Sequence, residues 1–208
     1  KMIYCTLLYK FSQFKGFFDY NGCEPFQITG ETIKKEFYGK ICKNADVDLL
    51  IEHYPIELAY ALALISSDDY QSITPPWLIK NYPKIENVIK FLCATPCNDE
   101  QCLYCADKLD VKKGLKRFFG HDSFRTYNGE PLQEAAARAA IERKSLLAVF
   151  PTGGGKSIAF QLPALMQSET THGLTVVISP LLSLMKDQVD NLNEKRIYDA
   201  VTINGLLS

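Results

Sequence analysis

A glycine-rich loop constrains this chain more than any other feature. Residues 146–150 form an apolar run, LLAVF, and residues 151–157 continue as PTGGGKS. An apolar run fits a buried strand, and three consecutive glycines allow backbone N–H groups to turn inward around phosphates. Lys156 adds a positive charge for the outer phosphates, and Ser157 offers a hydroxyl to Mg²⁺. The sequence therefore predicts a binding site for ATP and Mg²⁺, formed by Thr152, Gly153, Gly154, Gly155, Lys156 and Ser157. Lys156 and Ser157 are also the predicted catalytic residues.

Composition limits the possible partners. With 208 residues, 47% of them hydrophobic, the chain can bury one good core or two small ones. The net charge of −1 gives no whole-surface basic field, so any DNA contact must be local. Residues 56–65 are the longest apolar stretch, which is too short for a membrane span, and we expect a cytoplasmic protein, nucleoid-associated in a bacterium. The chain ends, Lys1 before Met2 and Ser208, look like those of a piece of a longer protein.

Four of the seven cysteines lie within residues 93–105, with the spacing C-x3-C-x4-C-x2-C. In a reducing compartment, clustered thiols hold a metal more often than they form disulfides. The last two form a two-residue knuckle that can place two thiolates on one face of a tetrahedral site. Structural zinc, free buried thiols and an iron–sulfur cluster all remain open. The candidate ligands are Cys93, Cys97, Cys102 and Cys105, whereas Cys5, Cys23 and Cys42 are interpreted as small core residues.

Residues 1–92 are aromatic-rich and mostly helical in pattern. Asp46 or Asp48 is predicted to cap a short helix, and Pro55 to open the apolar segment at residues 56–65. The prolines at positions 75 and 76 predict an extended segment before a helix over residues 83–91. The aromatic side chains near the start favour core packing over a base-stacking platform. No chemistry is assigned to this part.

From about residue 115 the pattern alternates between helix and strand. Helices are predicted over residues 131–143, after the glycine loop to residue 166, and over 181–195. Strands are predicted over residues 146–150, 174–178 and 200–203. Strands that are apolar on both faces belong in a parallel sheet covered on both sides, with ligands at its carboxyl edge. The predicted class is α/β, organised as a helical part (1–92), a cysteine-rich connector (93–111) and an α/β part (112–208).

Several motifs in residues 112–208 resemble the start of the RecQ family of DNA helicases, in superfamily 2. They are LKRFFGHDSFR (115–125), the helix that contains Gln133, PTGGGKS (151–157), FQLPA (160–164) and VVISPLLSLMKDQV (176–189). The resemblance implies a RecA-like parallel sheet that forms part of the first helicase lobe. It also implies an ATP-dependent DNA helicase of 3′ to 5′ polarity, with single-stranded or forked DNA as its partner.

By this resemblance, His121 stacks on adenine while Arg125 and Gln133 read its edge. The family places the glutamine three residues after the arginine, whereas this chain inserts residues 126–132 between them. A surface salt bridge is the alternative role for Arg125. The resemblance also implies contacts with the DNA backbone by Ser179, Pro180, Ser183, Lys186 and Asn204. The alternative for Lys186 is a position on a solvated helix face, and the alternative for Asn204 is a role in forming a turn.

The chain lacks two parts that phosphoryl transfer requires. No Asp-Glu-x-His segment follows the loop, and no second lobe with an arginine finger is present. We therefore expect efficient ATP hydrolysis only in a longer parent protein. Two rival functions are a P-loop phosphotransferase acting on a small molecule and a non-catalytic nucleotide-binding adaptor. The first needs a lid and an acceptor pocket that the sequence does not indicate, and the intact Lys156–Ser157 pair argues against the second.

Overall fold

The computed structural model describes residues 7, 28–67, 75–151 and 153–204. The chain divides into two compact units, unit 1 with Lys1–Leu109 and Glu169–Gly173, and unit 2 with Asp110–Ser168 and Leu174–Ser208. The early aromatic run, Cys5, Cys23 and Thr152 lie outside the described residues. Within the described ranges, no helix is both long and apolar enough to cross a membrane.

Local sequence signals explain where the helices of unit 1 begin. At the start of α4, the Asp46 carboxylate accepts a hydrogen bond from Leu49 N at 3.1 Å, and α5 begins with Pro55, as predicted. The prediction of extended backbone at Pro76 is wrong, because α6 begins there and the first helical turn needs no N–H from a proline. The described helices are α3 (Gly30–Glu36), α4 (Val47–His53), α5 (Pro55–Ser66), α6 (Pro76–Asn81), α7 (Ile85–Cys93) and α8 (Leu103–Lys108).

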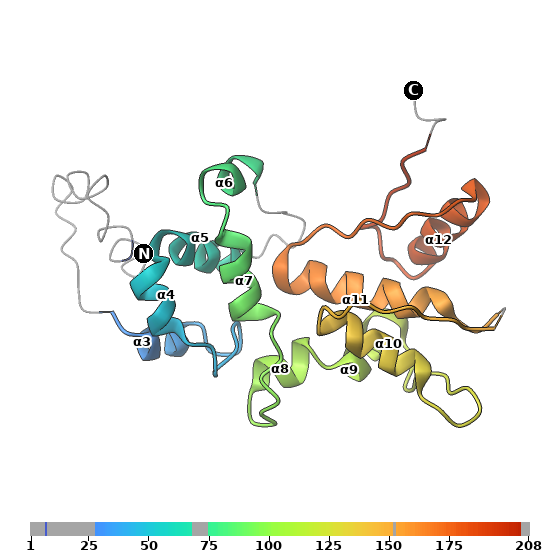
Figure 1. Cartoon of the computed structure of the whole chain (residues 1–208), viewed down its shortest axis with the longest axis horizontal. Helices are drawn as coiled ribbons and strands as arrows, with labels where there is room; N and C mark the ends of the chain where they lie inside the picture. The colour runs from blue at the N-terminus through green and yellow to red at the C-terminus, as the bar shows by residue number, and fades with distance from the viewer. Residues whose placement is uncertain (1–6, 8–27, 68–74, 152, 205–208) are drawn as a thin grey trace. The chain divides into compact units, whose positions relative to one another are not determined.

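The core of unit 1 lies mainly between α5 and α7. Helix α4 packs on α3 and on α5, and α6 packs on α7 (Figure 1). Helix α8 joins this core because the Tyr104 hydroxyl donates to Cys93 O at 2.8 Å, and Cys102, Tyr104 and Leu109 are buried in it. The cysteine-rich segment is thus packed into unit 1. The innermost side chains include Leu58, Leu62, Ile85, Ile89 and Leu92.

Unit 2 is built on packed helices. Its core includes Leu115, Ala137, Leu162 and Met166. A Cβ on Gly114 would lie 2.6 Å from Met166 Sδ, so a glycine allows α9 to approach α11 closely. The helices are α9 (Val111–Phe119), α10 (Leu132–Ile141), α11 (Lys156–Thr171) and α12 (Leu182–Glu194), of which the last three confirm the helices predicted from the sequence.

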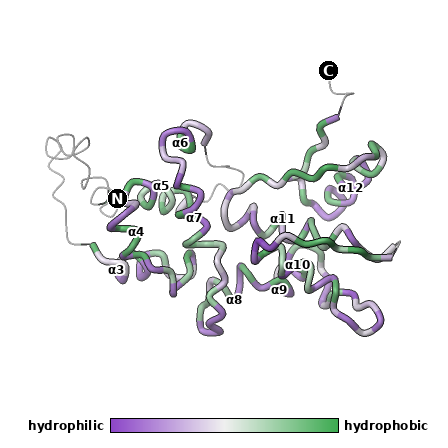
Figure 2. Tube along the Cα trace, viewed as in Figure 1, coloured by the Kyte–Doolittle hydropathy of each residue, from purple (hydrophilic) through white to green (hydrophobic). Residues whose placement is uncertain are grey.

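The parallel sheet predicted for this unit is not seen in the described residues. The segments 146–150, 174–178 and 200–203 are extended but have no ladder partner there. Their side chains lie largely in solvent, with Leu147 91%, Ile178 90% and Ile203 84% exposed. Figure 2 shows hydrophobic stretches along these extended parts of the trace. A strand in a parallel sheet makes its backbone hydrogen bonds to neighbouring strands. Without such neighbours, these segments remain extended and exposed.

Candidate functional site

The glycine loop leads from the extended residues 146–150 into α11. Gly153 and Gly155 have φ values of +74° and +67°, a left-handed conformation that glycine adopts without the strain of a Cβ. Lys156 is the first residue of α11 and is exposed, and Ser157 is half-buried. The loop thus lies at the N-terminal end of a 16-residue helix, where the helix dipole favours anions.

Three side chains bind the carbonyl oxygens of the three consecutive glycines. Arg125 Nη1 donates to Gly153 O at 2.9 Å, the Tyr127 hydroxyl donates to Gly154 O, and Gln133 Nε2 donates to Gly155 O at 2.8 Å. The Tyr127 ring also lies against the Phe150 ring, with centroids 5.2 Å apart. Carbonyl oxygens repel phosphate oxygens, so binding them to donors fixes their orientation and orders the loop. Tyr127 has no motif signal, and the sequence analysis missed it.

A tight turn absorbs the inserted residues 126–132. The backbone N–H and C=O groups of Tyr127 and Glu130 bond to each other at 2.9 Å, around Asn128 (φ +51°) and Gly129 (φ +85°). Asn-Gly is favoured at such positive-φ turns. The turn returns the chain so that the buried Gln133 Oε1 accepts a hydrogen bond from Arg125 N at 2.9 Å. The insertion therefore does not separate Gln133 from Arg125.

His121 lies in an exposed segment that follows α9. Helix α9 ends at Phe119 and is capped by Gly120, which has φ +70°, and Asp122 forms an ion pair with Lys116 at 2.9 Å. None of the hydrogen bonds described for the glycine loop involves His121. The structure thus brings Arg125 and Gln133 to the loop, while His121 is exposed.

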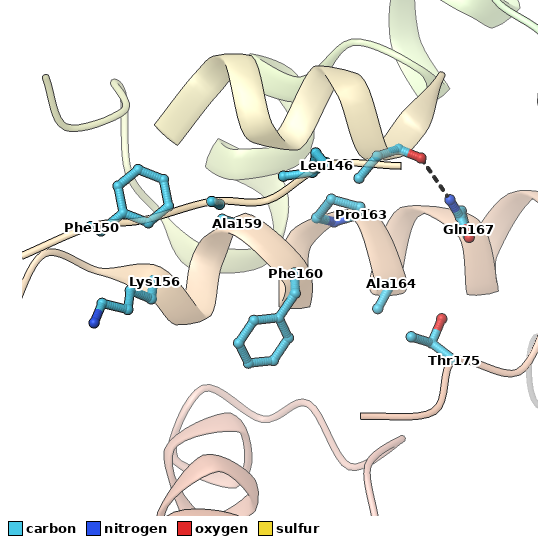
Figure 3. Close-up of a pocket in the computed structure, with 11 residues that line it drawn as sticks. Leu146, Phe150, Lys156, Ala159, Phe160, Pro163, Ala164, Gln167 and Thr175 are labelled. Atoms are coloured by element: carbon cyan, nitrogen blue, oxygen red, sulfur yellow. Dashed lines mark hydrogen bonds between the residues drawn. The ribbon is translucent and has the colours of Figure 1, made fainter. Parts of the chain in front are cut away.

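A groove of about 450 Å³ follows one side of α11. Figure 3 shows Lys156, Phe160 and Pro163 among its lining residues, together with Phe150 and Leu146 from the preceding extended segment. Gln167 Nε2 donates to Ala140 O at 3.2 Å, so α10 is joined to α11 beside the groove. The groove is mostly apolar and is lined by none of the three glycines, so it is not the predicted phosphate site.

Four of the predicted DNA-contact residues lie on α12 or just before it, and Asn204 follows it by ten residues. Ser183 and Lys186 are exposed on this helix, Pro180 is exposed before it, and Ser179 and Asn204 are half-buried. The Ser179 hydroxyl donates to Leu181 O at 3.5 Å. These side chains are therefore at least partly accessible to solvent.

One glutamine pair joins α11 to α12. Gln161 Nε2 donates to Gln188 Oε1 at 2.6 Å, and Gln161 is 9% exposed. Gln161 belongs to the motif segment FQLPA and Gln188 to VVISPLLSLMKDQV, and neither residue has a role predicted from the sequence. Their pairing fixes the helix that carries Ser183 and Lys186 to the helix that begins at the glycine loop.

A cluster of thiols in unit 1 differs in one member from the predicted set. The Sγ atoms of Cys42, Cys97, Cys102 and Cys105 all lie within 4.8 Å of one another. Cys93, the fourth predicted ligand, is buried instead, and its thiol contacts Lys40 O at 3.7 Å. The backbone explains the exchange, because Cys42 N donates to Leu92 O at 2.9 Å and so holds Cys42 beside the end of α7.

The thiols of this cluster, and that of Cys93 at the end of α7, differ in acidity. Burial raises the pKa of Cys42 to about 11 and of Cys93 to about 12, and it also raises the pKa of Cys105. Burial acts in the same direction on Cys102, but hydrogen bonds from the backbone N–H groups of Cys105 and Lys43 and from neighbouring thiols outweigh it. The resulting pKa of Cys102 is about 7. A thiolate therefore forms most readily at Cys102.

Comparison with known proteins supports the resemblance in unit 2. Residues 130–207 match the DEAD/DEAH box helicase family. An ATP-dependent helicase of Saccharomyces cerevisiae is 48% identical over 77 residues, which cover 37% of this chain and 5% of that protein. The ATP-dependent DNA helicase RecQ of Synechocystis is 44% identical over 92 residues, which cover 44% of this chain and 17% of the relative. No solved structure matches the chain.

A third relative extends the similarity. The ATP-dependent DNA helicase Q5 of Mus musculus is 47% identical over 99 residues, which cover 47% of this chain and 9% of that protein. The chain thus spans less than a fifth of the length of each of these relatives. The matched segment includes the glycine loop, α11 and α12. The chain therefore contains a RecQ-like segment of a DEAD/DEAH box helicase domain.

Proposed function

We propose that unit 2 binds ATP with Mg²⁺ and is part of the motor of an ATP-dependent DNA helicase. The observation that carries this proposal is the glycine loop at the start of α11, with its three carbonyl oxygens bound by Arg125, Tyr127 and Gln133. The names of the three relatives, all ATP-dependent helicases, support it. DNA unwinding in the 3′ to 5′ direction would belong to a longer protein that contains this segment.

The residues of the loop fit a triphosphate. A Cβ on Gly155 would lie 2.8 Å from Gln133 Nε2, and a Cβ on Gly154 would lie 2.8 Å from Pro151 O. The loop therefore accepts no side chain at either position and presents backbone instead, which is what phosphate binding by N–H groups requires. Lys156 would bind the outer phosphates, and Ser157 would supply a hydroxyl to Mg²⁺. Bound Mg²⁺ would neutralise part of the phosphate charge.

We propose two tasks for Gln133. Its Oε1 and Nε2 atoms each make one hydrogen bond, to Arg125 N and to Gly155 O. A side-chain amide offers two donors and two acceptor lone pairs, so one of each remains for the edge of an adenine. Arg125 would contact the same base, and His121 would stack on it. Gln133 would thus link recognition of the base to the order of the phosphate loop.

The contacts with DNA are proposed for the exposed side of α12 and the segments around it. Hydroxyls of Ser179 and Ser183, the backbone at Pro180, the Lys186 ammonium and the Asn204 amide are suited to bind sugar and phosphate without reading bases. We further propose that residues 146–150, 174–178 and 200–203 are strands of a RecA-like parallel sheet. Their exposed apolar side chains support this, because such strands are normally covered on both faces.

A helical part (1–92), a cysteine-rich connector (93–111) and a helicase part (112–208) form the proposed domain order, and the proposed location is the cytoplasm, at the nucleoid in a bacterium. A zinc ion held by cysteines would belong to unit 1 and take no part in ATP hydrolysis. A small-molecule phosphotransferase or an adaptor gains no support from the geometry of the loop.

DNA-stimulated ATP hydrolysis by the full-length protein tests this proposal. Lys156→Ala removes a charge that stabilises the transferring phosphoryl group, at a cost of about 3 kcal/mol, or more than a hundredfold in rate. Lys113→Ala is the matched control, because Lys113 is an exposed lysine on α9 of the same unit. We expect the control to keep the wild-type rate. A Lys156→Ala rate within threefold of wild type, with unchanged circular dichroism, would refute the proposed motor.

A further inference from the structure

Four thiols from separate segments of unit 1 converge on one point. The sulfur atoms of Cys42, Cys97, Cys102 and Cys105 lie within 4.8 Å of one another, and those of Cys42 and Cys102 are 4.0 Å apart. A tetrahedral zinc ion with Zn–S bonds of about 2.3 Å separates its sulfur ligands by about 3.8 Å. A disulfide needs a distance of about 2.05 Å, so this pair is not bonded. The spacing fits a single ion at the centre of the cluster.

We propose that Cys42, Cys97, Cys102 and Cys105 bind one structural Zn²⁺. Thiolates are soft ligands that favour zinc over hard cations, and four protein ligands leave no open position for a substrate. An iron–sulfur cluster contains several metal and sulfide ions, and it would hold its cysteine sulfurs farther apart than a single ion does. The compact sulfur cluster therefore favours zinc over the iron–sulfur alternative.

The surroundings of the thiols favour a negatively charged metal–thiolate complex. Lys43 Nζ and Asn44 Nδ2 both bond to Asp99 Oδ2, at 2.9 and 3.0 Å, and Asp99 Oδ1 accepts a hydrogen bond from Gln101 N at 2.8 Å. Asp99 thus joins the segment that follows Cys42 to the segment between Cys97 and Cys102. Zinc with four thiolates carries a net charge of −2, which the nearby Lys43 ammonium partly offsets.

A metal at this point would add to the packing that holds a short segment. Helix α8 has only six residues, fewer than an isolated helix needs to be stable. Cys102 and Cys105 lie at its start, Cys97 lies in the preceding loop, and Cys42 comes from a distant part of the chain. Coordination would tie these segments together, and metal-binding energy would become folding energy. The site is independent of the proposed nucleotide chemistry.

Metal analysis of the full chain, purified without added metal, tests the site. Wild type should hold about one zinc per chain. Cys42→Ser should lose it, because removing a ligand costs more than the ~10–100-fold in affinity that loss of an outer partner costs. Cys93→Ser is the matched control, since Cys93 is an equally buried thiol of unit 1 outside the cluster. It should keep about one zinc per chain.

A second measurement covers the case in which Cys42→Ser does not fold. Metal-free wild type is titrated with Co²⁺, and the intense visible absorption of tetrahedral thiolate ligation should saturate at one Co²⁺ per chain and disappear when Zn²⁺ is added. Cys42→His, which retains a ligand atom, should also bind one ion. Three results would each overturn the proposal: zinc lost from Cys93→Ser but kept by Cys42→Ser, iron with acid-labile sulfide in wild type, or neither zinc nor a Co²⁺ spectrum.

Discussion

Replacing Gln133 with methionine tests whether this side chain orders the glycine loop. The change keeps the length and approximate volume of the buried side chain but removes its hydrogen bonds to Arg125 N (2.9 Å) and Gly155 O (2.8 Å). Each bond contributes about 0.5–1.5 kcal/mol net, so the two together contribute about 1–3 kcal/mol. Because the loop must be ordered to bind phosphates, ATP affinity should fall by about 5–150-fold.

The assay is titration with a fluorescent ATP analogue, repeated with a GTP analogue. Loss of loop order weakens the binding of both nucleotides, whereas loss of adenine recognition weakens only the binding of ATP. Gln101→Met is the control, because Gln101 is exposed and belongs to unit 1. Unchanged affinity for both nucleotides in a folded Gln133→Met protein would refute the role of Gln133 in ordering the loop.

Two further predictions concern stability. Gly155→Ala should lower the free energy of unfolding by more than Gly39→Ala does. Both glycines have a positive φ, which costs about 1–2 kcal/mol once a Cβ is present, but only at Gly155 would the Cβ meet a neighbour, Gln133 Nε2 at 2.8 Å. Equal losses of stability for the two variants in urea denaturation would contradict this prediction. The Lys43 ammonium, with Asn44 and Gln101 N, lowers the pKa of Asp99 from 3.8 to about 2, so the ion pair stabilises the fold above about pH 4 and is lost as pH falls toward 2. The stability difference between wild type and Asp99→Asn should therefore shrink over that range, and a constant difference would show that the ion pair does not stabilise the fold.

The helices were largely predictable because their signals are local. Asp46 and Pro55 mark helix starts through one side-chain bond and one fixed φ angle, and the structure begins α4 and α5 there. Pro76 was misread because proline blocks a helix interior but not its first turn. A sheet is harder to predict from local signals, since strands depend on partners elsewhere in a chain, and residues 146–150 have no ladder partner among the described residues.

The glycine loop of the candidate nucleotide site was predictable from the sequence, but the side chains that bind its carbonyl oxygens were less so. Three glycines before Lys156 identify the loop, and Asn128-Gly129 carries the turn signal that explains how Gln133 returns to Arg125. Tyr127 was missed because no motif fixes an aromatic residue at that place. Its hydrogen bond to the loop arises from the turn geometry of this chain.

The thiol cluster shows the limit of prediction from sequence spacing. Cys97, Cys102 and Cys105 are close in sequence and lie together in the cluster, whereas Cys42 is far away in sequence and is brought to them by tertiary folding. Cys93 has a suitable spacing, but its thiol lies outside the cluster, because Cys93 is at the end of α7 and is buried against Lys40 O. Sequence spacing therefore predicts the two-residue knuckle, but the tertiary fold determines the remaining member of the cluster.

Hydrogen–deuterium exchange of the full chain, with and without MgATP, tests most directly whether unit 2 binds a nucleotide at the glycine loop. Peptides that cover residues 120–135 and 151–165 should exchange more slowly when MgATP is present, because the ligand would hold the loop and the three side chains bonded to it. Peptides from residues 42–105 should not change. Unchanged exchange at residues 151–165 under saturating MgATP, or slowing confined to unit 1, would contradict the proposed nucleotide site.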